Sequence, residues 1–512
     1  MISIIIKNEL KKFEADIRDL CMAFFPYQKL TFIHDDENEE TNESSRKGEQ
    51  IDSDIIIDNY FTGNLSGDRL TDKSEIKRQL YDYLSKLTGK KLLWGTLTGI
   101  RPVTIVTALI EQNKGESGNV GESGNVGASY ASPYGNNELK SFLKKEYYIS
   151  DEKANKLIDI ANREIEILNR DEIRDYKDRY SIYVGVPFCK STCLYCSFTS
   201  FNIDKFGEYV DKYLDTLELE FEKRSAEINN KLSPLTLYIG GGTPTSLNEK
   251  QFEKLLSIID KHIDMNSCIE YTVEAGRPDT ITKEKLLLMR EHKVNRISIN
   301  PQSFNQKTLD LIGRRHKTKD VIDKFMLARS LGFDNINMDI ILGLPNEHLL
   351  EVLNTLFNVY KLKPESLTVH SLALKRAARL NYELESWMKE TYLAGIADVN
   401  KTEGKRTIDK MYFMSNVLAK ILNLKPYYLY RQKNMAGNLE NIGFAKDGFE
   451  CIYNIMMMSE RHTVYGFGTA TSKEVFYENG GKRIESVEGY KSVIDYCKTN
   501  SVKKKGKCPI NN

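Results

Sequence analysis

Three cysteines lie close together in the chain and have the spacing of ligands to a metal cluster. Cys189, Cys193 and Cys196 form the pattern Cys-x3-Cys-x2-Cys within YVGVPFCKSTCLYCSF. Three thiolates can hold three irons of a four-iron cluster and leave one iron open. An open iron can bind a small molecule and pass an electron to it. The spacing therefore predicts an iron–sulfur site with one vacant corner.

Two other uses of these cysteines have less support. A structural zinc site can use Cys193 and Cys196, but it needs a second pair of ligands, and neither the other cysteines nor the seven histidines supply one with suitable spacing. A disulfide framework is not expected because the chain shows no sign of secretion. Iron–sulfur ligation is favoured, with zinc binding or chance clustering as the alternatives.

The composition is that of a soluble globular protein with two or three domains. The chain has 512 residues, of which 40% are hydrophobic and 28% are charged. The net charge of +1 gives no support for a nucleic-acid partner. No apolar segment reaches membrane-spanning length, and the short apolar N-terminus lacks a basic leader. We expect a cytoplasmic protein.

The middle of the chain alternates between β-rich apolar runs and helical segments. We expect strands at 181–186, 235–240, 270–275, 296–301, 336–342 and 366–371. We expect helices near 205–228, 250–263, 282–292, 318–331 and 347–362. Repeated βα units of this length predict an α/β fold with a parallel sheet closed or partly closed into a barrel.

Residues that can do chemistry follow these expected strands in order. The cysteines come after the first strand, and Gly240 to Gly242 come after the second. Glu274 lies at the third, Gln302 at the fourth and Asp339 within the fifth. The chemistry of such barrels gathers at the carboxyl ends of the strands, so these residues are candidates for one site.

Each candidate has a structural and a functional interpretation. The glycine run forms a tight turn, and it can also bring free backbone N–H groups close to a carboxylate or phosphate. Glu274 and Asp339 interrupt apolar strands, so each needs an internal partner or a polar ligand. Arg314 suits anionic groups or a solvated helix end.

The regions on either side are less informative. Residues 1–175 are expected to form an accessory α+β domain with flexible insertions at 34–50 and 115–136, and the motif WGTLTGIRP has no purpose that the sequence reveals. We expect the barrel core at 176–380 and a mostly helical C-terminal domain at 381–512.

Four strings together resemble the radical SAM superfamily, and within it the oxygen-independent coproporphyrinogen III dehydrogenase (oxidase) family. They are YVGVPFCKSTCLYC, IGGGTPTSL, RISINPQSFNQKTLDLIGRRH and NMDIILGLPNE. The family has a partial (β/α)6 TIM-like barrel. The segments PYYLYRQKNMAGNLENIGFA and GFGTATSK resemble its C-terminal domain, and the N-terminal region suggests the longer variant.

The resemblance implies the cofactors and their ligands by motif position. Cys189, Cys193 and Cys196 would ligate a [4Fe-4S] cluster whose open iron is chelated by S-adenosylmethionine. The positions that match S-adenosylmethionine contacts are Tyr183, Gly241, Gly242, Thr243, Glu274, Gln302, Arg314, Asp339 and Ala373. Tyr195 matches an aromatic position beside the cofactor.

The resemblance also implies the reaction. A 5′-deoxyadenosyl radical would remove hydrogen from propionate side chains of coproporphyrinogen III, which lose carbon dioxide to give the vinyl groups of protoporphyrinogen IX in haem biosynthesis. An electron donor such as flavodoxin or ferredoxin would be a partner. The four propionates need a basic rim, for which the candidates are Arg315, Lys375, Arg376, Arg379, Arg431 and Lys433.

Two departures from the family pattern leave the substrate step open. Phe198 stands where the well-studied dehydrogenases have a fourth cysteine, and Gly185 stands where they have a histidine. Both changes occur in a sister branch of haem chaperones, although that branch has a His-Asn-x-x-Tyr-Trp motif that this chain lacks. Cys451 and the nearby methionines can ligate haem or pack in the core. The alternatives are a haem chaperone and a radical SAM enzyme with another substrate.

Overall fold

The contacts of the chain divide it into two units. The computed structural model describes residues 2–26, 28–35, 55–99, 101–115, 135–196, 198, 200–229, 233–373, 378–380, 407–432, 435–478 and 481–499. Unit 1 comprises residues 1–161 together with 431–440, and unit 2 comprises 162–430 together with 441–512. Residues 34–50 and 115–136, for which flexible insertions are predicted, lie mostly outside the described residues.

Unit 1 contains a small parallel sheet with helices packed against it. The strand order is β2-β1-β3. The strands are β1 (Ile2–Lys7), β2 (Leu30–Asp35) and β3 (Ile55–Ile57), and the helices are α1 (Glu14–Phe24), α2 (Arg69–Thr88), α3 (Val103–Gly115), α4 (Asn136–Tyr147) and α5 (Asp151–Leu168), of which α5 continues into unit 2. The apolar run of β1 is buried and packs against α1 and α2 in one core.

Unit 2 is built on an eleven-stranded sheet. Its order is β12-β13-β11-β10-β9-β8-β7-β4-β14-β15-β16, so β12 and β16 are its edges among the described residues and the barrel is partial. The six central strands are parallel: β4 (Arg179–Val186), β7 (Ser233–Gly241), β8 (Glu270–Glu274), β9 (Arg296–Ser298), β10 (Ile336–Leu342) and β11 (Ser366–Ser371). The predicted α/β barrel and the order of its six strands are confirmed.

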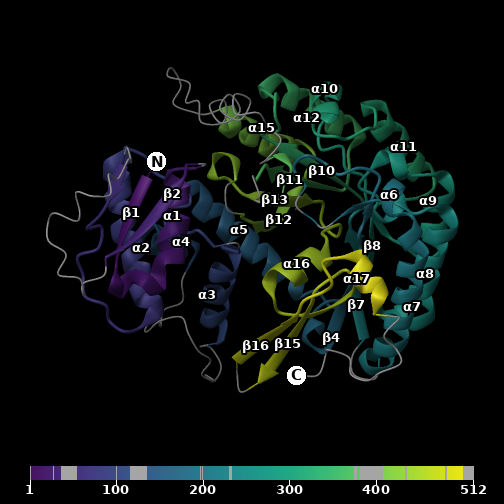
Figure 1. The fold of residues 1–512 in the computed structure, drawn as a ribbon, viewed down its shortest axis with the longest axis horizontal. Coiled ribbons are helices and arrows are strands. Elements are labelled where there is room, and N and C mark those ends of the chain that lie inside the picture. Colours follow the sequence, from purple (N-terminus) through teal and green to yellow (C-terminus); the bar gives the residue numbers. More distant parts are fainter. Residues whose placement is uncertain are drawn as a thin grey trace. The chain divides into compact units, whose positions relative to one another are not determined.

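Helices connect these parallel strands and cover the outer side of the sheet (Figure 1). They are α6 (Ile203–Phe206), α7 (Glu208–Asn229), α8 (Glu249–His262), α9 (Lys283–Glu291), α10 (Gln306–Leu311), α11 (Thr318–Ser330) and α12 (Leu349–Leu362). Their sequences contain the start signals that such crossovers need. At α8, for example, Asn248 and Gln251 each accept a hydrogen bond from the backbone N–H of the other, which satisfies free N–H groups of the first turn.

One predicted strand ends early for a local reason. β9 stops at Ser298, whereas the sequence predicts a strand to residue 301. Pro301 has no N–H to donate, and Gln302 adopts a left-handed backbone with φ +62°. The chain therefore turns at the end of β9, and Gln302 makes only an isolated bridge with Ile340 of β10.

The C-terminal region differs from the mostly helical domain that the sequence predicts. Its described part supplies five strands to the same sheet: β12 (Lys425–Tyr430), β13 (Asn441–Ala445), β14 (Thr463–Gly468), β15 (Ser472–Glu478) and β16 (Gly481–Val487). The helices are α15 (Thr407–Ile421), α16 (Ile452–Ser459) and α17 (Val493–Lys498). The parallel core leaves the outer edges of β4 and β11 unpaired, and β14 and β13 satisfy their backbone groups.

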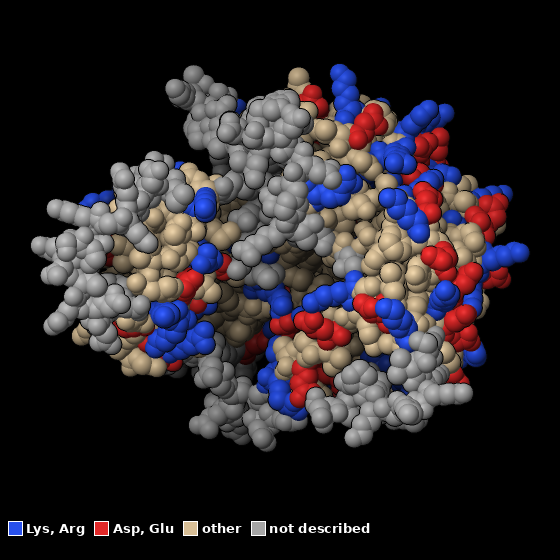
Figure 2. Space-filling model, viewed as in Figure 1, with Lys and Arg blue, Asp and Glu red and all other residues tan. Residues whose placement is uncertain are grey.

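The surface agrees with the near-zero net charge. Over the outer helices of unit 2, lysine and arginine alternate with aspartate and glutamate on the face shown in Figure 2. No helix among the described residues is long and apolar enough to cross a membrane.

The carboxylate of Glu270 attaches α16 to the barrel. Glu270 opens β8, is buried, and accepts hydrogen bonds from the backbone N–H groups of Ile452 (2.6 Å) and Tyr453 (3.3 Å) in the first turn of α16. An anion at a helix N-terminus satisfies free N–H groups and interacts favourably with the helix dipole.

We predict that Glu270→Ala lowers the free energy of unfolding of unit 2 by about 3 kcal/mol, because it leaves buried N–H groups without an acceptor. Urea denaturation followed by circular dichroism measures the change. Glu222→Ala, on the exposed face of α7, is the matched control. Equal unfolding curves for the two variants would contradict the role given to Glu270.

Candidate functional site

The three cysteines lie on one loop that is fixed at several points. Cys189 ends the short strand β5 (Phe188–Cys189), which pairs with β6 (Phe201–Asn202). Cys189 and Cys193 are buried, and Cys196 is partly exposed. Leu194, between them, donates its N–H to Ile312 O at 2.9 Å and accepts one from Leu380 N at 2.7 Å. The thiols are therefore presented by a loop held from two other segments.

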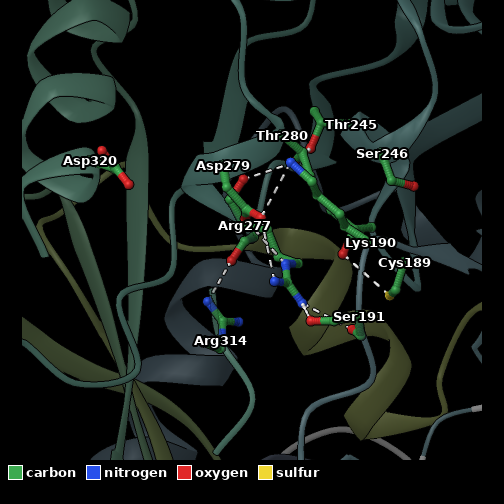
Figure 3. Close-up of polar contacts among 12 residues, drawn as sticks. Cys189, Lys190, Ser191, Thr245, Ser246, Arg277, Asp279, Thr280, Arg314 and Asp320 are labelled. Atoms are coloured by element: carbon green, nitrogen blue, oxygen red, sulfur yellow. Dashed lines mark hydrogen bonds and ion pairs between the residues drawn. The ribbon is translucent and has the colours of Figure 1, made fainter. Parts of the chain in front are cut away.

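A buried arginine holds the same loop from the barrel side. Arg277 follows β8 and is only 2% exposed. Its guanidinium donates to the backbone oxygen of Ser191 at 2.9 Å and to the hydroxyl of Ser191 at 2.7 Å, as Figure 3 shows. The Ser191 hydroxyl in turn donates to Gly313 O at 2.9 Å. Arg277 and Ser191 thus fix the cysteine loop to the end of β8 and to the segment that follows α10.

The charge of Arg277 is balanced within the site. Its Nε donates to Asp279 at 3.2 Å. Burial acts to raise the pKa of Asp279, but the charge and hydrogen bonds of Arg277 bring that pKa below its ordinary value. Asp279 therefore remains ionised beside the guanidinium, and the pair needs no ligand to be satisfied.

A second buried arginine lies beside the cysteines. Arg314 donates to the backbone oxygens of Gly276 (3.0 Å) and Asn300 (2.7 Å). Burial acts to lower its pKa, but the neighbouring Tyr195 and Cys193 raise it above the ordinary value, so the guanidinium stays charged. Its buried Nε has no hydrogen-bond partner in the structure. This donor is available to a ligand at the cysteine loop.

The glycine run brings the end of β7 against the cysteine loop. A Cβ on Gly242 would lie 2.6 Å from Phe188 O, and Gly241 has φ +102°, so neither position accepts a side chain without movement. The N–H of Gly242 donates to Val186 O at 2.8 Å, and that of Thr243 to Phe188 O at 2.7 Å. The prediction of free N–H groups in the run Gly240 to Gly242 is wrong at Gly242.

The first cysteine is in contact with the residue that follows the glycines. Cys189 Sγ lies 3.4 Å from Thr243 Oγ1. Burial raises the pKa of the Cys189 thiol above its ordinary value. A metal ligand must be the thiolate, so loading of this site releases a proton.

Two of the predicted carboxylates have internal partners. Asp339 accepts from Asn337 Nδ2 at 2.7 Å and lies 3.7 Å from His370 Nε2. Burial acts to raise the pKa of Asp339, but the hydrogen bond and charge of His370 lower it below its ordinary value. Glu274, at the end of β8, accepts from the Tyr238 hydroxyl at 2.7 Å.

The fourth strand end presents an unsatisfied group. Gln302 is held by its backbone, donating its N–H to Asp339 O at 2.9 Å and accepting one from Ile341 N at 3.0 Å. Its buried Oε1 has no partner in the structure. An orphaned buried acceptor costs free energy unless a ligand donates to it, so Gln302 and Arg314 Nε together indicate a polar ligand.

Stacked tyrosines lie next to Glu274. Tyr183 of β4 stacks on Tyr238 of β7 with ring centroids 5.9 Å apart, and Tyr453 of α16 stacks on Tyr238 at 4.6 Å. Burial raises the pKa of Tyr183 above its ordinary range, so its phenol remains neutral. The stack forms an apolar wall with hydroxyl groups along its edge.

The remaining predicted residues differ in burial, in the unit to which they belong and in whether the structure describes them. Ala373 is buried just beyond β11, while Arg315 and Arg379 are exposed, and Arg379 donates to Thr192 O in the cysteine loop at 3.5 Å. Lys375, Arg376 and Lys433 lie outside the described residues, and Arg431 belongs to unit 1. Cys451 is fully buried against Glu270, as packing in the core requires.

Sequence reasoning missed four residues of this site: Tyr238, Arg277, His370 and Tyr453. Glu274 is a predicted site residue because it lies at the end of an expected strand. Arg277, three residues later, meets the same criterion. Tyr238 and His370 are internal to strands and have no distinguishing spacing. Tyr453 lies far along the chain, on a helix that only the tertiary fold brings to β7.

The thiols fit a cluster better than a single ion. Among the described residues, no group of three or more His, Cys, Asp or Glu side chains is arranged to hold one metal ion. In a four-iron cluster each thiolate binds a different iron, so the three sulfurs need not converge on one point. The cysteine loop with its adjoining orphaned groups agrees with that requirement.

Comparisons with known proteins give related descriptions. A model of the radical SAM superfamily matches residues 183–357. The chain is 37% identical over 407 residues to the oxygen-independent coproporphyrinogen-III oxidase-like protein HemZ of Bacillus subtilis, which covers 78% of this chain and 74% of that protein. It is 39% identical over 196 residues to the heme chaperone HemW of Bacillus subtilis, or 38% of this chain and 51% of that protein.

Two further matches involve Escherichia coli. The chain is 31% identical over 193 residues to its oxygen-independent coproporphyrinogen III oxidase, covering 38% of this chain and 42% of that protein. The solved structure of its coproporphyrinogen III oxidase HemN aligns with 60% of this chain and 69% of its own, with a TM-score of 0.46 and 21% identity. In sequence, the chain thus matches about half of the length of the heme chaperone and less than half of that of the Escherichia coli oxidase.

The protonation of Glu274 yields a pH-dependent prediction. Burial raises its pKa to about 7, although the hydrogen bond from Tyr238 opposes this, and the charge of Asp339 adds to the rise. In the unfolded chain the carboxyl has its ordinary, lower pKa. Between these two values the folded protein holds a proton that the unfolded chain releases, so the contribution of Glu274 to stability falls as pH rises.

We predict that Glu274→Gln is more stable than the parent by about 2 kcal/mol at pH 8 and matches it at pH 5, since the amide carries no charge at either pH. Urea denaturation of the metal-free protein at both pH values measures this. Glu253→Gln, exposed on α8, should leave stability unchanged. A difference between parent and Glu274→Gln that is the same at pH 5 and pH 8 would disprove the assignment.

Proposed function

The chain belongs to the radical SAM superfamily, in the family of oxygen-independent coproporphyrinogen III oxidase-like proteins, and on this basis we propose that it oxidises coproporphyrinogen III. The reaction is the oxidative decarboxylation of propionate side chains to vinyl groups, which gives protoporphyrinogen IX. The observation that carries the proposal is the fixed loop of three thiols beside two orphaned buried polar groups, at the carboxyl ends of the barrel strands. The names of the relatives support the substrate.

The family's cofactors are a [4Fe-4S] cluster and S-adenosylmethionine, and the site offers matching groups for both. Cys189, Cys193 and Cys196 would each hold one iron. Gln302 Oε1 and Arg314 Nε would accept from and donate to the amino-acid part of S-adenosylmethionine. Tyr183, Tyr195, Gly241, Gly242, Thr243, Glu274, Asp339 and Ala373 complete the proposed cofactor site. When bound, the two cofactors supply the radical chemistry.

The chain's own residues would position the reactants and exclude water. Arg277 and Ser191 fix the cysteine loop, so the cluster ligands do not have to be ordered at each turnover. The stacked rings of Tyr183, Tyr238 and Tyr453 would form an apolar wall that helps to exclude water. Exposed Arg315 and Arg379 would attract the propionate carboxylates, and a flavodoxin or ferredoxin would supply electrons.

We predict that Cys193→Ala loses the visible absorbance and iron content of the reconstituted cluster, because one of three thiolate ligands is gone. Cys497→Ser, on α17, is the control and should keep both. Retention of full iron content in Cys193→Ala would show that the ligand assignment is wrong.

Enzyme activity is the direct test of the proposed reaction. The protein is purified anaerobically, its cluster is reconstituted, and it is incubated with a reductant, S-adenosylmethionine and coproporphyrinogen III. We expect vinyl products in mass spectrometry, and each converted propionate should lower the mass by one carbon dioxide and two hydrogen atoms. Cys193→Ala should form none. A fully loaded parent protein that cleaves S-adenosylmethionine but forms no vinyl product would overturn the substrate assignment.

A haem chaperone is the second candidate, and one observation favours it. Phe198 is 68% exposed two residues after Cys196, where the sequence departs from the dehydrogenases. The chain is also 39% identical over 196 residues to the heme chaperone HemW of Bacillus subtilis. Stoichiometric haem binding without vinyl formation would favour this function over the first. Vinyl formation without haem binding would exclude it.

A further inference from the structure

Unit 1 contains a pocket that the proposed chemistry does not use. The pocket opens to solvent, and its empty volume of about 430 Å³ includes that open part. Its polar wall includes Thr98, Arg431 and Asn438, and its apolar wall includes Met22, Pro26 and Met435. Two sequence motifs without an assigned role meet here, WGTLTGIRP at 94–102 and RQKNMAGNLE at 431–440.

Arg431 is the central cation of this pocket. It is 5% exposed, and its guanidinium donates to Leu97 O and to Asn438 Oδ1 (2.5 Å). Its Cζ lies 4.8 Å from the centre of the buried Trp94 ring. The buried Nε has no hydrogen-bond partner in the structure. A guanidinium has five N–H donors, so this one retains a free edge that suits a bidentate acceptor.

The other charges nearby leave Arg431 without a counterion. Glu440 is fully buried, but it accepts from Lys153 Nζ at 2.7 Å and from Trp94 Nε1 at 3.0 Å, and Lys156 Nζ lies 3.7 Å away. No carboxylate among the described residues lies within ion-pair distance of Arg431. Burial lowers its pKa to about 10, and Glu440 opposes this only in part. A buried charge of this kind is costly unless something pairs with it.

The acidic residue of the pocket limits the charge of a ligand. Asp19 also lines the wall. It interacts with Lys77, which is 7% exposed and donates to Thr98 Oγ1 at 2.8 Å. Burial lowers the pKa of Lys77, and the negative charge of Asp19 acts to raise it. With Asp19 offset by Lys77, Arg431 supplies one net positive charge. A monoanion matches this single positive charge, whereas a phosphate dianion would leave one negative charge without a partner.

We propose that this pocket binds a carboxylate carried on an apolar body, with the carboxylate against the free edge of Arg431 and the aliphatic part against Met22, Pro26 and Met435. The carboxylate can belong to a free short-chain acid or to a propionate side chain of a tetrapyrrole. The proposal does not depend on the radical chemistry, because the pocket lies wholly in unit 1.

Trp94 provides a local signal for the test. The chain has two tryptophans, so Trp387→Phe leaves Trp94 as the only one. The whole protein with this substitution is titrated with butyrate, with butyramide as the neutral analogue and with inorganic phosphate, and the fluorescence of Trp94 is followed. We expect a saturable change with butyrate alone. Arg431→Gln should weaken butyrate binding at least tenfold. Arg78→Gln, which removes two ion pairs in the same unit, should not.

Coproporphyrin III distinguishes the two sources of the carboxylate. If coproporphyrin III displaces butyrate from the parent, and this competition is lost in Arg431→Gln, the ligand is a tetrapyrrole propionate. Butyrate binding that coproporphyrin III does not displace would identify a free acid. No saturable response of the parent to either compound would overturn the proposal, as would binding that Arg431→Gln leaves unchanged.

Stability separates a ligand-binding role from a structural one. If the role of Arg431 is to bind a carboxylate ligand, Arg431→Met should have the same melting temperature as the parent or a higher one. Butyrate should raise the melting temperature of the parent and leave that of Arg431→Met unchanged. A clear fall in the melting temperature, with no effect of butyrate on the parent, would mean that Arg431 only braces Leu97 and Asn438.

Discussion

The parallel pairing of β4 with β7 is the constraint on which the candidate site depends. The register places Gly185 opposite Gly240 and Val186 opposite Gly241. Beyond the strands, the ladder continues into the loops through Gly242 N to Val186 O and Thr243 N to Phe188 O. The cysteine loop is thus an extension of the sheet. The absence of side chains on the glycines is what allows this approach, because a Cβ on Gly242 would collide with Phe188 O.

The site then depends on buried cations whose partners are mostly backbone oxygens. Arg277 and Arg314 bond to the carbonyl groups of Ser191, Gly276 and Asn300, which are strand ends or loops. Asp279 balances the charge of Arg277, whereas the backbone bonds of Arg314 fix its geometry and give it no carboxylate partner among the described residues. A site that holds negatively charged sulfur ligands is a place where this excess charge is favourable. The same surroundings that position the loop therefore also suit it for thiolates.

The sequence was sufficient for the barrel and for its six parallel strands. Repeated βα units and the residues at their ends predict the six parallel strands, and all six are present. It was insufficient wherever long-range contacts decide the outcome. The five strands of the C-terminal region complete a sheet whose free edges the local pattern does not reveal. Tyr453 reaches Tyr238 only because Glu270 holds the start of α16.

The free N–H groups expected of the glycine run illustrate the same limit. Local composition correctly indicates that the backbone there must approach something closely. It does not indicate whether that neighbour is a ligand or another strand, and in the structure it is Phe188. The orphaned groups of the site are instead side chains, Gln302 and Arg314, whose lack of a partner depends on the packing of several strands at once.

The path of the chain between β12 and β13 gives the two units a covalent relation that matters for function. The chain leaves the barrel at Tyr430, contributes residues 431–440 to unit 1, and returns at Asn441. Tyr430 lies 3.4 Å from His370, and His370 lies 3.7 Å from Asp339 in the candidate site. Arg431 therefore directly follows Tyr430, which contacts His370 and, through it, Asp339. Residues 431–440 thus join two adjacent strands of the barrel sheet, and the pocket proposed around Arg431 begins directly after Tyr430 in the sequence.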